Sequence, residues 1–376
     1  MYLNYWGLTK HAFNNVPDPT MYFDMHATVE NAVAELLFAI EEADECLAVV
    51  VGDVGLGKTM SLRVTLDSLD QSKYRIAFVT NPDLTFPQLL REIIGQLKNQ
   101  PCMIKNKDEL LEEFNKILFT TADEGKRVLI FIDEGNVIRR MNLQSLRLLT
   151  NMQEDDRNLF TMVLAGQPEL GKNLEHPSNA NLYQRIGVYC RLNKMESRDV
   201  VKSYVEHRME CAGVKRQIFT EDAYTRIYEY SEKGIPRLVN RICKLALKAG
   251  ETNKMQEISG EVIVQIGERF ARTEPLKHKD DSEPKEGEPA MEVKHPRPKK
   301  KSAPAADAEE NITVVEDVKP EAVLPEADAE PEGMKPKNIL SQVKSDLGRE
   351  ATPMKELLDR LKDRNRHIGR SNPFFK

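Results

Sequence analysis

The stretch VVVGDVGLGKTMSL, residues 49–62, decides the fold class of this chain. Its residues 52–59 fit the pattern G-x-x-x-x-G-K-[ST], in which glycines let the backbone curl until several N–H groups converge on one phosphate. The apolar run before the glycines predicts a buried strand, and the residues after them predict a helix whose N-terminus adds partial positive charge. This context disfavours a chance glycine-rich turn. The stretch therefore predicts a loop that holds the phosphates of a nucleotide.

Two side chains of this loop have separate expected roles. Lys58 would neutralise the β- and γ-phosphate oxygens, and the hydroxyl of Thr59 would hold Mg²⁺. Backbone N–H groups along the loop would form the rest of the cradle. The candidate nucleotide-binding residues of the loop are Gly52, Asp53, Val54, Gly55, Leu56, Gly57, Lys58, Thr59 and Met60.

The acidic end of RVLIFIDEGN, residues 127–136, predicts the other half of the site. Asp133 would reach the metal, and Glu134 would polarise a water for in-line attack on the γ-phosphate. The competing interpretation is two solvated acids in a turn, which the upstream phosphate loop disfavours. The string Asn-Lys-Asp-Glu at 106–109 precedes this strand, which is the wrong order for a GTPase. The expected ligands are therefore ATP and Mg²⁺.

Short apolar runs alternate with amphipathic stretches in the first half of the chain. Such alternation is typical of βαβ units, which build a parallel sheet covered on both faces. The expected strands are residues 46–51, 75–80, 127–132, 160–165 and 187–192. The predicted fold class is α/β, a P-loop NTPase with a parallel five-stranded sheet and helices on both faces.

The pattern changes twice after the last expected strand. Four helical stretches with Ser197, Thr220 and Ser259 at N-cap positions predict a small all-helical lid. Residues 273–337 contain no Phe, Trp, Tyr or Cys and ten of the 20 prolines, a composition that predicts disorder. The expected domains are an adenine-side strip (1–25), an ATPase core (26–193), a helical lid (194–271), a disordered linker (272–337) and an amphipathic docking tail (338–376).

Composition and charge exclude several classes of protein. The net charge of −6 argues against a general polyanion binder. The basic run at 297–301 is interpreted as a solvated part of the linker, with contact to nucleic acid or anionic lipid as the alternative. Five cysteines without a CxxC pair argue against a zinc site or a disulfide framework. We expect neither a leader nor a membrane span, because the N-terminus has no basic region followed by a long apolar one and the apolar runs are far shorter than the ~18 residues of a span. We expect a cytoplasmic protein that reaches the inner membrane through partners.

Several strings together resemble the AAA+ ATPases of the general secretory pathway protein A type, a family that includes the MSHA pilus-biogenesis ATPase. The resemblance covers about residues 1–270 and implies an AAA+ core followed by the lid. The strings are YWGLTKHAFNNVPDPTMYF at the N-terminus, TNPDLT, LAGQPEL at 164–170, YQRIGVYCRL and GIPRLVNRICKLAL.

The resemblance also implies roles for residues outside the glycine-rich loop and the acidic strand end. Gln167 would position the attacking water, Arg185 would be an arginine finger acting on a neighbouring subunit, and Pro17 and Tyr22 would line the adenine pocket. The alternatives are an ordinary surface arginine at 185 and aromatic residues that cap the sheet. Arg237 matches the sensor-2 arginine. Its place in the first turn of a helix beginning at Pro236, where the macrodipole disfavours a cation, also favours a nearby anion.

The chain departs from the family at three points. Gly135-Asn136 stands where the family usually has Ala-Gln, which leaves the coupling role of the residue at 136 in doubt. The transmembrane helix and peptidoglycan-binding domain that follow the lid in the archetype are not expected here. An amphipathic tail follows instead, and we interpret it as a docking peptide for a protein partner, with packing onto the ATPase as the alternative.

Three functions fit these observations. The leading hypothesis is an ATP-hydrolysing AAA+ assembly factor for an envelope system (type II secretion, a pilus or polysaccharide export) that works as a nucleotide-dependent homo-oligomer. The alternative is a DNA-binding ATPase of the transposition-helper type, which the acidic net charge disfavours. A nucleotide switch without hydrolysis is the third, and Glu134 argues against it.

Overall fold

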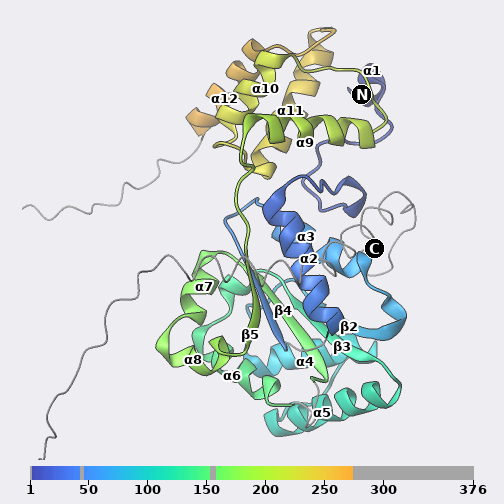
Figure 1. Ribbon diagram of the computed structural model, residues 1–376, viewed down its shortest axis with the longest axis vertical. Coiled ribbons are helices and arrows are strands. Elements are labelled where there is room, and N and C mark those ends of the chain that lie inside the picture. The colour runs from blue at the N-terminus through green and yellow to red at the C-terminus, as the bar shows by residue number, and fades with distance from the viewer. Residues whose placement is uncertain (1, 43–45, 153–157, 274–376) are drawn as a thin grey trace, which may run out of the picture. The chain divides into compact units, whose positions relative to one another are not determined.

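The computed structural model describes residues 2–42, 46–152 and 158–273 (Figure 1). The predicted linker (272–337) lies outside the described residues from 274 onward, as do the basic run and the docking tail, whereas residues 272 and 273 belong to the last helix. Within them, a five-stranded parallel sheet has the order β2-β3-β4-β1-β5. The strands are β1 Leu47–Val51, β2 Tyr74–Val79, β3 Arg127–Ile132, β4 Phe160–Gly166 and β5 Ile186–Arg191. The predicted α/β fold class with a parallel sheet is confirmed.

The central strands are buried on both faces because helices cover the sheet from both sides. In β1, Leu47, Val49 and Val51 belong to one apolar cluster, whereas Ala48 and Val50 belong to the other. Two helices pack over the second cluster, α2 Ala27–Glu42 and α3 Lys58–Ser68. The first cluster is covered by α4 Phe86–Lys98, α5 Lys107–Asp123, α6 Arg140–Thr150, α7 Pro168–Leu174 and α8 Ala180–Tyr183.

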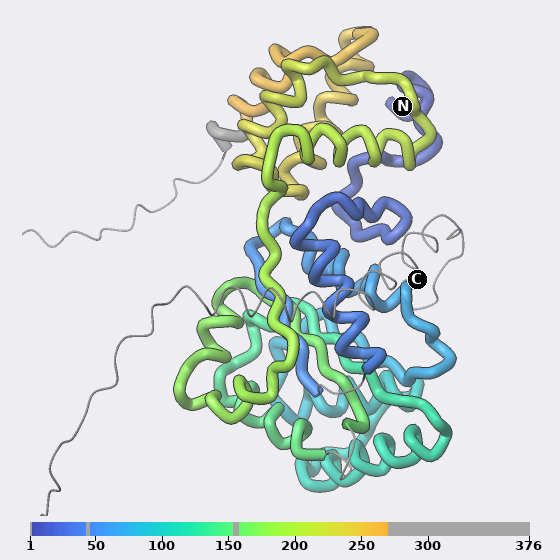
Figure 2. The backbone as a smooth tube through the Cα atoms, in the orientation of Figure 1, coloured from blue at the N-terminus to red at the C-terminus, as the bar shows by residue number. Residues whose placement is uncertain are grey.

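A helical unit follows the sheet, and Figure 2 traces the connection from β5 into it. Its helices are α9 Arg198–Cys211, α10 Glu221–Tyr230, α11 Pro236–Thr252 and α12 Gly260–Thr273. The short 3₁₀ turns elsewhere are η1 Pro19–Met21, η2 Gln71–Lys73, η3 Gly135–Val137 and η4 Pro177–Asn179. Ser197 caps α9 by accepting from the Val200 N–H (3.3 Å). At Thr220, the hydroxyl instead donates to Asp222 (2.5 Å), so the expected side-chain cap of α10 does not form.

The N-terminal segment packs on the helical unit and contributes to its core. Helix α1, Tyr2–Trp6, places the Trp6 indole N–H against the Leu247 carbonyl (2.8 Å). Gly250 lies under the same ring, where a Cβ would come within 2.5 Å of Trp6 Cζ2. Phe23 contacts Tyr204 edge-on with ring centroids 5.5 Å apart. The interpretation that the N-terminal aromatic residues cap the sheet is therefore wrong for Phe23.

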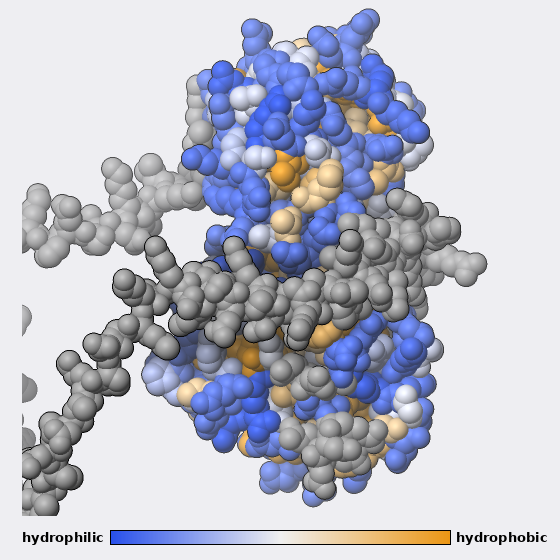
Figure 3. Space-filling model, in the orientation of Figure 1, coloured by the Kyte–Doolittle hydropathy of each residue, from blue (hydrophilic) through white to orange (hydrophobic). Residues whose placement is uncertain are grey.

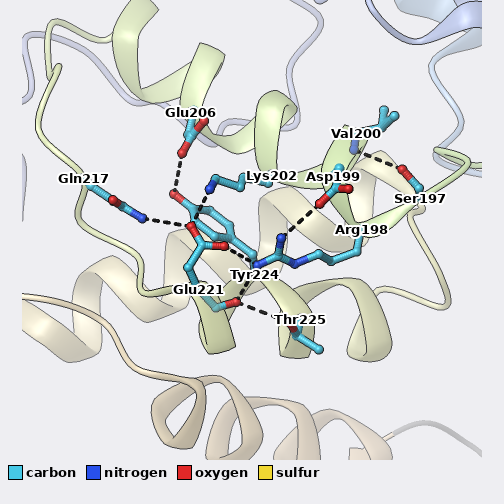
Figure 4. A network of polar contacts seen from close by, with 10 residues as sticks. All are labelled: Ser197, Arg198, Asp199, Val200, Lys202, Glu206, Gln217, Glu221, Tyr224 and Thr225. Carbon is cyan, nitrogen blue, oxygen red and sulfur yellow. Dashed lines mark hydrogen bonds and ion pairs between the residues drawn. The ribbon is translucent and has the colours of Figure 1, made fainter.

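A charged network joins the first two helices of the unit, as Figure 4 shows. Glu221, at the start of α10, accepts hydrogen bonds from Lys202 and Arg198 of α9. These two hydrogen bonds lower the pKa of Glu221 to about 2, so the carboxylate is charged at neutral pH. Nearby, the Tyr224 hydroxyl donates to Glu206 (3.3 Å). The network therefore links α9 and α10 on the exposed face of the unit.

The face drawn in Figure 3 is mostly hydrophilic, with small separate apolar patches. Large exposed apolar side chains include Met103 (81%), in the loop between α4 and α5, and Met141 (78%), in α6. In the part of the chain that the structure describes, every helix falls short of the length and apolarity that a membrane span requires.

Candidate nucleotide-binding site

The glycine-rich loop lies between the end of β1 and the start of α3, as its context in the sequence predicts. The Gly52 N–H donates to the Gly166 carbonyl of β4 (3.2 Å), which fixes the loop to the neighbouring strand. Gly55 and Gly57 have φ angles of 84° and 104°, in the region that favours glycine. Helix α3 begins at Lys58, so its free N–H groups face the concave side of the loop. This is the backbone geometry that a phosphate requires.

The Lys58 ammonium lies inside the loop. Its Nζ donates to the carbonyls of Gly52 (2.7 Å) and Asp53 (2.9 Å). Burial lowers the pKa of Lys58, and the nearby carboxylate of Asp133 opposes that shift. Neutral carbonyls are weaker partners for an ammonium group than phosphate oxygens are. A bound phosphate would therefore compensate the positive charge of Lys58 better than these two carbonyls do.

Thr59 and Asp133 meet although they are 74 residues apart in the sequence. The Thr59 hydroxyl donates to Asp133 Oδ2 (2.5 Å), and Asp133 Oδ1 accepts from the Glu134 N–H (2.8 Å). Asp133 is 5% exposed and its own N–H donates to the Val79 carbonyl (2.9 Å). A hydroxyl beside a carboxylate is the hard oxygen donor set that fits Mg²⁺, which keeps several waters and phosphate oxygens as further ligands.

Glu134 adopts an unusual backbone conformation. Its φ of 52° and ψ of 34° place a residue other than glycine in the left-handed region. Such residues are held by their surroundings and cluster at functional sites. The residue is exposed and lines the same cavity as Lys58 and Thr59, as the expected water-polarising role requires.

The departure at residues 135 and 136 has a structural reason. Gly135 is buried, and a Cβ there would lie 3.2 Å from both the Ala165 carbonyl and the Leu170 side chain. Asn136 Oδ1 accepts from the Gln167 N–H (3.2 Å). The ends of β3 and β4 are therefore joined through Asn136, and Gln167 lines the cavity beside Glu134.

Arg237 lies at the second position of α11 and touches the glycine-rich loop. Its N–H donates to the Gly55 carbonyl (3.2 Å), and its side chain lines the cavity. A Cβ on Gly55 would come within 2.6 Å of the Arg237 Cβ. The first turn of the lid helix is thus in direct contact with the loop, as the sensor-2 assignment requires.

Replacing Gly55 by alanine is expected to separate these two elements. The new methyl group clashes with Arg237, and a φ of 84° is costly for alanine, so we expect the free energy of unfolding to fall by roughly 1–3 kcal/mol. ATP affinity should fall severalfold because Arg237 is displaced. Gly7→Ala is the matched control, since Gly7 has a φ of 76° with nothing within 4 Å. Urea unfolding and ATP titration give the readouts, and equal losses in both variants would contradict the argument.

The cavity has a volume of about 520 Å³, within the range usual for small-molecule sites. Pro17 and Tyr22 line it together with the loop, as expected. Arg185 does not line it. Its guanidinium donates to the Thr150 carbonyl (2.6 Å) and to Asn151 Oδ1 (2.8 Å) at the end of α6. Arg185 therefore stands away from this chain's own site.

Several cavity residues were not predicted from the sequence. His26 is 5% exposed, and burial lowers its pKa, while hydrogen bonds with the backbone of Lys194 and Asn193 oppose that shift. Polar residues among the others include Asn15, Tyr204, Arg208 and Asn240. The available signal was weak: Tyr204, Arg208 and Asn240 are polar residues on the apolar faces of α9 and α11.

Comparison with known proteins agrees with this geometry. A family model described as an AAA domain matches residues 41–174, which include the glycine-rich loop and Asp133-Glu134. Residues 41–174 of this chain are therefore similar to an AAA domain. The General secretion pathway protein A of Aeromonas hydrophila is 33% identical over 252 residues, 66% of this chain and 45% of that protein. The resemblance to that family is confirmed over this region, and the chain spans less than half the length of that relative.

Solved structures of other proteins share the fold over about two thirds of this chain. The Aeropyrum pernix ORC2 protein, solved as ADPNP–ADP complexes, aligns with a TM-score of 0.53 at 16% identity, covering 69% of this chain and 71% of that one. The Pyrobaculum aerophilum Cdc6p structure aligns with a TM-score of 0.54 at 16% identity, covering 69% and 70%. At these identities the likeness shows the fold.

Proposed function

We propose that this protein binds ATP with Mg²⁺ and hydrolyses it. The observation that carries the proposal is the contact between Thr59 and Asp133 beside Lys58, because it joins the phosphate loop to the acidic strand end. A carboxylate, a hydroxyl and an ammonium at one end of a parallel sheet form the set that phosphoryl transfer needs.

Each residue has a distinct part in the proposed reaction. The loop N–H groups and Lys58 bind the phosphates and withdraw charge from the γ-phosphate as the bond to the leaving oxygen lengthens. Glu134 accepts a proton from the attacking water, and Gln167 orients that water. Thr59 and Asp133 hold Mg²⁺, which when bound neutralises phosphate charge. Arg237 brings a cation from the lid to the same phosphates.

The cellular role that we propose is an assembly or energising function in a bacterial envelope system, exerted by a nucleotide-dependent oligomer with a protein partner. The similarity to General secretion pathway protein A supports the envelope assignment. The contact between Arg237 and Gly55 supports nucleotide-dependent lid movement, because a ligand at the loop changes the partners of Arg237.

Substituting Lys58 by alanine tests the proposal. Loss of a charge-assisted hydrogen bond to phosphate costs roughly 1.5–3 kcal/mol, so ATP affinity should fall about tenfold to 150-fold. Fluorescence anisotropy with labelled ATP and Mg²⁺ measures it. Lys73→Ala is the control, because Lys73 is an exposed lysine outside the cavity. Unchanged affinity in the Lys58 variant would refute ATP binding by this loop. In cell extracts, ATP-dependent co-purification with envelope proteins that Lys58→Ala abolishes would support the cellular role.

A further inference from the structure

A buried arginine begins a chain of hydrogen bonds that ends in the nucleotide cavity. Arg208 of α9 is 3% exposed. Its guanidinium donates to the carbonyls of Ala12 (2.7 Å) and Asn14 (3.3 Å) in the N-terminal segment. A third donation goes to the Tyr204 hydroxyl oxygen (2.8 Å). Arg208 therefore holds the N-terminal segment on the lid. It also makes the Tyr204 hydroxyl oxygen a hydrogen-bond acceptor.

The donor character of arginine sets the direction of every later bond. Arginine has no acceptor, so the Tyr204 oxygen accepts from Arg208 and its proton must point elsewhere. That proton goes to Asn240 Oδ1 (2.9 Å), which fixes the amide orientation of Asn240. Asn240 Nδ2 then donates to Asn15 Oδ1 (3.3 Å). Each hydrogen bond in this series is therefore donated in the same direction, from Arg208 towards Asn15.

Asn15, the last residue in this series of hydrogen bonds, presents N–H donors to the cavity. Because Asn15 Oδ1 accepts from Asn240, the orientation of the Asn15 amide is set as well. Its Nδ2 has no protein acceptor among residues 2–42, 46–152 and 158–273. Asn15 is exposed and lines the cavity together with Pro17 and Tyr22. The cavity wall on this side thus offers an oriented amide N–H₂.

We infer that Asn15 is a base-recognition residue that donates a hydrogen bond to an acceptor nitrogen of bound adenine. This inference rests on the proposed binding of ATP. Adenine carries three unprotonated ring nitrogens (N1, N3 and N7) that accept such a bond. Arg208, Tyr204 and Asn240 are positioning residues, because they act through Asn15 and keep its amide in one orientation. A site built to donate to a ring nitrogen discriminates against an analogue that lacks it.

Deaza analogues of ATP test the inference, since each replaces one ring nitrogen by C–H. Dissociation constants are measured for ATP, 1-deaza-ATP, 3-deaza-ATP and 7-deaza-ATP on the full chain with Mg²⁺. We expect one analogue to bind the wild-type protein about fivefold to tenfold more weakly than ATP. The same analogue and ATP should bind Asn15→Ala equally well. Asn4→Ala is the matched control, because Asn4 is an exposed amide of the same N-terminal segment outside the cavity, and it should keep the wild-type difference.

A second variant separates positioning from a general loss of structure. Tyr204→Phe removes the hydroxyl link and keeps the ring that contacts Phe23. The penalty for the sensitive analogue should fall below about threefold, because the amides of Asn240 and Asn15 are no longer held in one orientation. A melting temperature recorded with each titration shows that the lid is folded.

The outcomes distinguish this inference from the proposed function. If Asn15→Ala keeps the wild-type spread among the four nucleotides, or if wild type binds all four equally, Asn15 does not read the base and the inference is wrong. ATP binding through Lys58 is untouched by either result. If Lys58→Ala binds ATP as tightly as wild type does, the proposed function itself fails.

Discussion

Glu134→Gln is expected to lower kcat for ATP hydrolysis by roughly 10²–10⁴-fold and to leave the affinity for ATP within about threefold of wild type. Glutamine has the same length and cannot take a proton from water at neutral pH. Its amide also fits the exposed position that Glu134 occupies at the edge of the cavity. Phosphate release under saturating ATP gives kcat, and anisotropy gives the affinity.

The matched control for this variant is Glu169→Gln. Glu169 is an exposed carboxylate in the first turn of α7, close enough to Lys58 to affect its pKa but outside the cavity. It makes the same change of charge without touching the expected position of the water. If Glu134→Gln and Glu169→Gln have the same kcat, Glu134 is not the base. A Glu134 variant that has lost ATP binding would place its role in the ground state.

Arg185→Ala is expected to lower kcat by about 10³-fold or more at concentrations where the protein self-associates. In this chain the Arg185 guanidinium binds the end of α6 and does not line its own cavity. Direct contact of Arg185 with a γ-phosphate therefore requires the site of a neighbouring copy. A trans-acting arginine stabilises charge that develops on the γ-phosphate, so the loss should appear in kcat with ATP affinity little changed.

Mixing two inactive variants tests this arrangement directly. Glu134→Gln subunits keep Arg185, and Arg185→Ala subunits keep Glu134, so mixed oligomers should regain activity at sites that combine both groups. Arg226→Ala, which removes a surface arginine paired with Glu229, should behave like wild type. Failure of the mixture to recover any turnover, or a fully active Arg185→Ala protein, would exclude a finger at this position. Melting curves monitor the contacts with Thr150 and Asn151.

The sheet and the phosphate loop were predictable because both depend on local patterns. Each strand lies within one residue of its expected bounds, since a buried parallel strand is a short continuous apolar run and leaves little choice of register. The pairing of Thr59 with Asp133 follows from the same topology, because β1 and β3 end at one edge of the sheet. The lid helices were predictable for similar reasons.

The wall of the cavity opposite the phosphate loop was not predictable from the sequence. Asn15, Tyr204, Arg208 and Asn240 are scattered over 226 positions and meet only because the N-terminal segment folds back onto α9 and α11. Their side chains satisfy one another, and a single sequence gives no pattern for hydrogen bonds between distant elements. The left-handed backbone of Glu134 also escaped prediction, because non-glycine residues adopt it only under tertiary constraint.

Two arginines, one in the lid and one in the sheet-bearing part, donate hydrogen bonds to the N-terminal segment. Arg208 of the lid holds the Ala12 carbonyl (2.7 Å), and Arg63 of α3 in the sheet-bearing body holds the Pro17 carbonyl (2.9 Å). Five peptide units between these carbonyls extend to at most about 18 Å. While both hydrogen bonds are formed, the segment between them therefore has a maximum length. That length limits how far the lid can move away from α3.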